Sequence, residues 1–127
     1  IKKKKMRTPK DYEQAYIDLC LKALNENRIK TPTDDYEEHH IRPTKCGGLD
    51  NSVHLVLVTP KEHLALHACL VEFLEDEELL AMSYALNMMH NTRKDNPDKY
   101  SSEKIHEKNK KRLSALRSKK ALEKKNS

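Results

Sequence analysis

The chain has 127 residues, of which 35% are charged and 36% hydrophobic, with one Phe and no Trp. This length suits one domain with a small core, and no apolar run approaches the roughly 20 residues that span a bilayer. Ile1 and the lysines that follow it lack the apolar stretch of a secretory signal, so the sequence predicts a soluble, intracellular protein without a membrane partner. The three cysteines are widely spaced and include no Cys-x-x-Cys pair, which argues against a disulfide framework and against a four-cysteine zinc site.

The net charge of +5 is unevenly distributed along the chain. Residues 1–10 carry six basic and no acidic side chains, and residues 91–127 carry thirteen basic and five acidic ones. Residues 11–90 have six basic side chains against fifteen acidic ones. Two basic ends favour a polyanionic partner such as a nucleic acid, and solvated tails are the alternative interpretation.

An amphipathic helix is predicted over residues 9–27. The Thr8-Pro9-Lys10-Asp11 segment provides a hydroxyl cap, a proline at the first helical position and a carboxylate near the positive end of the helix dipole. Residues 28–35 then form a connector. The apolar residues that recur at helical spacing, and are expected to form one buried face, are Tyr12, Ala15, Tyr16, Leu19, Ala23 and Leu24.

A strand hairpin and a helix are predicted next. Residues 36–41 and the β-branched-rich run at 53–58 have strand length, and Gly47 and Gly48, the only glycines, predict a sharp turn in the long loop between them. The Thr59-Pro60-Lys61-Glu62 segment is a capping box with proline just inside the helix. It predicts a helix over residues 60–73.

Two further helices are predicted in the last third of the chain. The first opens at residues 75–78 and is followed by a loop at 91–100, and the second is capped by Ser101 or Ser102 and runs to about residue 124. The last helix has only a thin apolar stripe among many Lys and Arg, so it can lie along a phosphate backbone or extend into solvent. The apolar positions of the two helices are Leu79, Leu80, Met82, Ala85, Leu86 and Met89, and then Ile105, Leu113 and Leu116.

Five of the seven histidines fall within the predicted strand-loop-strand-helix unit. His63 and His67 are four residues apart, so on a helix their rings project from one face about 6 Å apart and can chelate one divalent ion, although two exposed surface histidines would show the same spacing. A zincin metalloprotease is excluded because its motif requires Glu after the first His, where this chain has Leu64. His39 and His40 point to opposite faces of a strand, so one can join the metal site while the other lies nearby as a base.

Residues 36–70 resemble the HNH nucleases of the ββα-metal (His-Me finger) type, and among them the phage-encoded HNH homing endonucleases most closely. Weaker similarity at residues 79–89 and at Tyr100-Ser101-Ser102 extends the resemblance over most of the chain. The features that carry it occur in one order at compatible spacings: Glu38-His39-His40-Ile41-Arg42-Pro43, Gly47-Gly48, the run from Leu55 to Val58, the capped helix start, His63 and His67.

This resemblance implies a mostly helical α+β fold built around a ββα-metal core, a two-stranded hairpin plus a helix, with one N-terminal helix and C-terminal helices. The expected organisation is a basic arm (1–8), a helix and connector (9–35), the nuclease core (36–73), a supporting helix and loop (74–100) and a basic helix (101–127).

The resemblance also implies the roles of individual residues. His39, His63 and His67 are expected to bind one divalent ion (Zn, Mg, Mn, Ni or Co), and His40 to act as general base. Arg42 is a candidate for holding the scissile phosphate, with a solvated loop charge as the alternative. His54 stands where the family has its central Asn, and we expect it to organise the loop or to lie close to the metal. The residues expected to contact DNA are Lys104, Lys108, Lys111, Arg112 and Arg117.

The predicted function is therefore metal-dependent hydrolysis of DNA phosphodiester bonds, by nicking or by double-strand cleavage. The expected partner is double-stranded DNA, bound by a monomer or a homodimer, in the cytoplasm of a bacterial cell that hosts a phage. Two alternatives are a catalytically decayed DNA-binding module and a small structural zinc domain in which the histidines only hold the fold.

Overall fold

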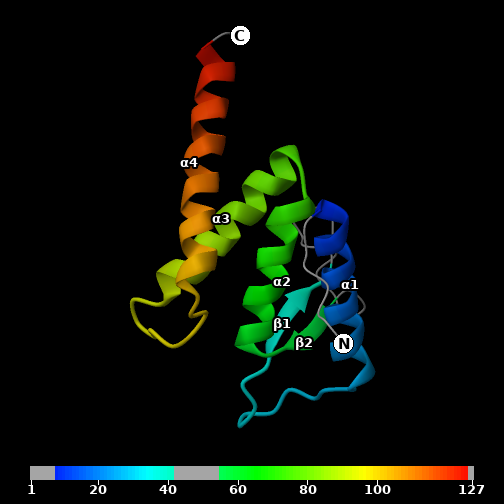
Figure 1. The fold of residues 1–127 in the computed structure, drawn as a ribbon. Coiled ribbons are helices and arrows are strands. Elements are labelled where there is room, and N and C mark those ends of the chain that lie inside the picture. Colours follow the sequence, from blue (N-terminus) through cyan, green and yellow to red (C-terminus); the bar gives the residue numbers. More distant parts are fainter. Residues whose placement is uncertain (1–7, 42–54, 126–127) are drawn as a thin grey trace.

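In the computed structural model, the described residues are 8–41 and 55–125. They form a mostly helical α+β fold with one two-stranded antiparallel sheet, as predicted (Figure 1). In the part that is described, no helix is both long enough and apolar enough to cross a membrane. The elements are α1 (Pro9–Asn25), β1 (Glu37–His40), β2 (Leu55–Val58), α2 (Pro60–Phe73), α3 (Asp76–Thr92) and α4 (Glu103–Lys125).

Capping boxes begin α1 and α2, as the sequence predicts. The Thr8 hydroxyl accepts from the Asp11 backbone N–H at 3.2 Å, and the Thr59 hydroxyl accepts from the Glu62 N–H at 3.1 Å. The bounds of α2 agree with the prediction. Helix α1 ends at Asn25, earlier than predicted, because Asn27 takes the left-handed conformation with φ of 50° and the helix cannot continue through it.

The two strands pair in one register, with His39 opposite Val56 and His40 opposite Leu55. Strand β1 has four residues and is shorter than predicted. Strand β2 covers the last four residues of the predicted 53–58, and residues 53 and 54 lie outside the described ranges. Pairing ends where Glu37 faces Val58, because the next residue, Thr59, already caps α2. The predicted sharp turn at Gly47 and Gly48 lies outside the described residues.

The core lies where α2 packs between α1, the hairpin and α3, and Figure 1 shows α1 and α2 side by side over the strands. Tyr16 and Ala23 of α1 are buried as predicted, but Leu24 is 42% exposed, contrary to the prediction. At about 100° per residue, Leu24 lies roughly 80° from the stripe that is centred on Tyr16, and so falls outside the buried face.

Helix α4 packs against α3, and its C-terminal part extends away from the hairpin (Figure 1). Ser102 caps it: its hydroxyl accepts from the Ile105 N–H at 3.4 Å, and its carbonyl accepts from the His106 N–H at 3.1 Å. The interface is partly polar, because the Asn109 side chain donates to the Ser83 carbonyl at 2.9 Å and the rings of His90 and His106 lie 4.7 Å apart. This interface holds the basic helix on the core.

Candidate metal centre

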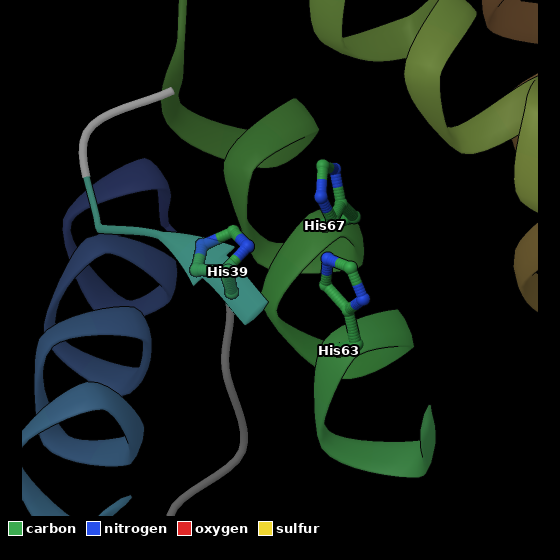
Figure 2. A group of neighbouring side chains, drawn as sticks. All are labelled: His39, His63 and His67. Carbon is green, nitrogen blue, oxygen red and sulfur yellow. The ribbon is translucent and has the colours of Figure 1, made fainter. Parts of the chain in front are cut away.

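Three histidines come together between β1 and α2, and we call them the histidine cluster: His39, His63 and His67. One ring nitrogen from each lies within 4.8 Å of the other two, and the ring centroids are 5.0 to 5.2 Å apart. His63 and His67 project from successive turns of α2 toward the strand that carries His39 (Figure 2). The three predicted ligands are thus brought together, and they can hold a metal ion.

The protonated nitrogen of His39 is determined by its neighbour on α1. The Tyr16 hydroxyl donates to the Ile41 carbonyl, which can only accept, so its hydrogen is committed there. The same hydroxyl oxygen lies 2.8 Å from Nε2 of His39 and must accept from it. Nε2 therefore carries the hydrogen, and Nδ1 of His39 keeps a lone pair for a metal.

A carboxylate determines the tautomer of His63 in the same way. Nδ1 of His63 lies 3.0 Å from Oε1 of Glu37 and donates to it, which leaves the Nε2 lone pair of His63 for a ligand. Glu37 also accepts from the Tyr100 hydroxyl at 2.5 Å and pairs with Lys99 at 2.7 Å. Burial works to raise the pKa of Glu37, but the hydrogen bonds from Lys99, Tyr100 and His63 outweigh it and lower that pKa. An ionised carboxylate behind a histidine is a common outer-shell arrangement at metal sites.

His67 is the member of the cluster with an unsatisfied nitrogen. Its side chain is buried, and its Nδ1 finds no hydrogen-bond partner among the described residues. A buried polar atom without a partner is unfavourable, and a bound ion or water could supply the missing interaction.

All three imidazoles are held neutral. Burial, together with the neighbouring histidines, lowers the pKa of His39 to about 2 and that of His67 to about 3. Burial also lowers the pKa of His63, although Glu37 opposes the shift. Neutral imidazole is the form that binds metals, and three of them suit Zn²⁺, Ni²⁺ or Co²⁺ better than Mg²⁺, which prefers oxygen. The donor set therefore fits a divalent transition metal.

The position of α2 relative to the strands is fixed by an ion pair next to His63. The Arg28 guanidinium, from the connector after α1, donates to both Glu62 oxygens, at 2.5 and 3.0 Å, and to the Leu57 carbonyl at 3.1 Å. Hydrogen bonding to Arg28 is the main cause that lowers the pKa of Glu62 to about 2. Because the Glu62 side chain also completes the capping box with Thr59, this contact joins the connector, β2 and the start of the helix that carries His63 and His67.

Three further residues were predicted to belong to the site: His40, Arg42 and His54. His40 is half-buried on the opposite face of β1, consistent with the predicted alternation. Arg42 and His54 lie outside the described residues.

The basic residues predicted to contact DNA differ in their surroundings. Lys108 and Arg112 form ion pairs with Glu72 of α2, at 2.9 and 2.6 Å. Arg117 donates to the Tyr84 hydroxyl at 3.2 Å. Lys104 and Lys111 are exposed, and within the described ranges neither forms an ion pair. These two are therefore the most available of the five for an external anion.

The sequence prediction missed the residues that orient the ligands: Tyr16, Glu37, Lys99 and Tyr100. The role of Glu37 was predictable from the sequence, because residues two apart in a strand share a face and His39 is a candidate ligand on that face. Tyr16 was predicted only as a core residue, although a buried phenol requires a polar partner. Tyr100 is 63 residues from Glu37 in sequence, and no local pattern indicates that contact.

Comparison with known proteins relates the chain to mobile endonucleases. It is 36% identical over 80 residues to the "Probable mobile endonuclease B" of Enterobacteria phage T4, and 31% identical over 85 residues to the "Probable mobile endonuclease E" of the same phage. It is also 36% identical over 59 residues to an uncharacterized 38.5 kDa protein in psbA intron 1 of Chlamydomonas moewusii.

The extent of these matches is partial. They cover 62%, 66% and 46% of this chain, and 29%, 57% and 16% of the respective relatives, so the chain spans less than a third of the first phage protein and little more than half of the second. No protein-family profile and no solved structure matches the chain. The similarity thus supports a relationship to mobile endonucleases, because both phage proteins carry that name.

Proposed function

We propose that the chain is a metal-dependent endonuclease of the HNH type that hydrolyses phosphodiester bonds of double-stranded DNA. The observation that carries the proposal is the histidine cluster on a hairpin-helix unit, in which hydrogen bonds from His39 and His63 leave one lone pair on each ring for a metal. The similarity to proteins named mobile endonucleases supports the choice of DNA as substrate.

The proposed role of each residue is the one that the resemblance to HNH nucleases implies. His39, His63 and His67 would hold the ion, which when bound would polarise the scissile phosphate and stabilise the charge on the leaving oxygen. His40, next to His39 but on the other face of β1, is the proposed general base that takes a proton from the attacking water. Arg42 and His54 keep their proposed roles at the phosphate and in the loop.

The basic helix α4 is the proposed contact with the DNA backbone. Lys104 and Lys111 are its first candidates because both are exposed and have no ion-pair partner in the described part of the chain. Contacts to phosphate add affinity and carry no base information, so α4 would position the duplex without selecting a sequence.

The test is nicking of supercoiled plasmid by wild type, His40→Ala and His63→Ala, each with Mg²⁺, Mn²⁺, Co²⁺, Ni²⁺ or Zn²⁺ and with chelator. Wild type should cut in at least one metal, and both variants should lose most of the activity. Met88→Ala is a control on α3: Met88 is 69% exposed and lies outside the histidine cluster, so the variant should cut like wild type. Absence of cleavage by wild type in every metal would refute the nuclease, and DNA binding that persists without cleavage would identify a decayed binding module.

A structural zinc domain is the second candidate, and a specific observation favours it. His39 and His67 are only 2% and 9% exposed, so two of the three ligands lie in the core, where a metal would stabilise the fold. In that case chelator should unfold the protein, which circular dichroism would detect, and His40→Ala should change nothing.

A further inference from the structure

The end of the loop between α3 and α4 reaches the histidine cluster through one carboxylate. The Tyr100 hydroxyl donates to Oε1 of Glu37 at 2.5 Å, and the same oxygen accepts from Nδ1 of His63 at 3.0 Å. Lys99 holds the other carboxylate oxygen at 2.7 Å, and its ammonium lies over the Tyr100 ring, 5.2 Å from the centroid. Both oxygens of Glu37 are therefore fixed from this loop.

Tyr100 is itself firmly held from the opposite side. Its side chain is 8% exposed, and its backbone carbonyl accepts from Nε2 of His106, a buried residue of α4, at 2.7 Å. Tyr100 also has φ of 56°, a left-handed conformation that is unusual for a bulky residue and persists only where the surroundings impose it. The position of the Tyr100 side chain is therefore fixed relative to the start of the basic helix α4.

We propose that Tyr100 is a positioning residue for His63: its hydroxyl orients the Glu37 carboxylate so that His63 carries its hydrogen on Nδ1 and presents Nε2 to the metal. Without this hydroxyl, Oε1 of Glu37 loses one of its two donors and the carboxylate can rotate away from His63. The inference rests on the metal site of the proposed function and extends it.

A consequence concerns α4. His106 donates to the Tyr100 carbonyl, and the Tyr100 hydroxyl and His63 both donate to Glu37, so these hydrogen bonds join the helix proposed to contact DNA to a proposed ligand of the metal. Packing of α4 on the core then contributes to metal affinity, and metal binding stabilises that packing to the same extent.

The test is a Zn²⁺ titration in competition with a chromophoric chelator, using wild type, Tyr100→Phe and Tyr84→Phe. Tyr100→Phe removes only the hydroxyl, and its Zn²⁺ affinity should fall about tenfold, as is typical when an outer-shell partner is lost. Tyr84→Phe is the matched control: Tyr84 is exposed, its hydroxyl contacts Arg117, and its variant should bind Zn²⁺ like wild type. In the metal-free protein, the ¹⁵N shifts of His63 should report one Nδ1–H tautomer in wild type and a mixture in Tyr100→Phe.

The outcomes separate this inference from the proposed function. If Tyr100→Phe binds Zn²⁺ within twofold of wild type and keeps one tautomer, the positioning role is wrong while the metal site stands. If wild type binds no Zn²⁺, the metal site fails, and the tautomers still show whether Tyr100 orients His63. Should Tyr100→Phe not fold, Glu37→Gln, which keeps the size and an acceptor oxygen, should lose on the order of tenfold or more in Zn²⁺ affinity, and an unchanged affinity would overturn the inference.

Discussion

Tyr16 and His39 are 23 residues apart in sequence, and the Tyr16 hydroxyl lies 2.8 Å from Nε2 of His39 in the core. The hydroxyl donates its hydrogen to the Ile41 carbonyl, so it accepts from the imidazole and determines which ring nitrogen faces the cluster. Helix α1, which precedes the hairpin-helix unit, thus helps to orient the histidine cluster. The contribution of the Tyr16 hydroxyl to stability can be measured in the metal-free protein.

Tyr16→Phe should destabilise the metal-free protein by about 1–3 kcal/mol, because the buried N–H of His39 is left without an acceptor. Urea unfolding at pH 8 with chelator gives the free energy of unfolding. Tyr84→Phe removes an exposed hydroxyl and should stay within about 0.5 kcal/mol of wild type. Equal stability of wild type and Tyr16→Phe would show that His39 does not depend on this acceptor.

Acidification should destabilise the metal-free protein, with His67 as one cause. The pKa of His67 is lowered to about 3 by burial, whereas in the unfolded chain it is about 6.5. Below pH 6.5 the unfolded state binds a proton that the folded state does not, so stability is lost as the pH falls from about 6.5 toward 3. In that pH range, each such histidine lowers the free energy of unfolding by about 1.4 kcal/mol for every unit by which the pH falls.

Replacing His67 with Leu isolates this contribution, because Leu fills the buried site without titrating. The free energy of unfolding of His67→Leu should fall less steeply than that of wild type between pH 6.5 and 4.5, by about 1.4 kcal/mol per unit. Urea unfolding across that range, with chelator present, provides the comparison. Parallel curves would mean that His67 is protonated in the folded state.

Zinc should stabilise the fold through the histidine cluster. A ligand that binds only the folded state adds about 2.7 kcal/mol at a concentration one hundred times its Kd, and thermal unfolding should shift upward accordingly. His63→Ala should lose most of this shift, whereas Met88→Ala, at an exposed position of α3 outside the cluster, should keep it. A shift that survives His63→Ala would place the zinc elsewhere on the chain.

The Arg28–Glu62 pair should matter more than an exposed pair of the same kind. The two side chains are 6% and 15% exposed, so Arg28→Met leaves a largely buried carboxylate with only the more distant Lys22, at 3.6 Å, and should cost about 3 kcal/mol. Lys30 and Glu38 form the matched control at 3.8 Å, both 52% exposed, and Lys30→Met should cost less than about 1 kcal/mol. Similar losses in the two variants would contradict the role of Arg28 in fixing the start of α2.

The parts of the fold and site that sequence predicted well depend on short-range rules. The capping box determined where α2 begins, and a spacing of four placed His63 and His67 on one face, so these features needed no tertiary information. Tyr100 shows the limit: its contact with Glu37 exists only once α3 and α4 are packed, and neither residue indicates it locally. Leu24 shows a second limit, since helical spacing alone did not locate the edge of the buried stripe.

The DNA contacts proposed for α4 can be tested by salt dependence. Lys104 and Lys111 are exposed and have no ion-pair partner among residues 8–41 and 55–125, whereas Lys108 pairs with Glu72, so the first two are better placed to displace counterions from DNA. The double variant Lys104→Ala/Lys111→Ala should reduce the slope of log Kobs against log salt by about 1.8, or about 0.9 for each lost contact. Lys108→Ala should change the slope less, and fluorescence anisotropy with a labelled duplex and Ca²⁺ in place of the active metal gives binding without cleavage. An unchanged slope in the double variant would move the DNA contact away from this part of α4.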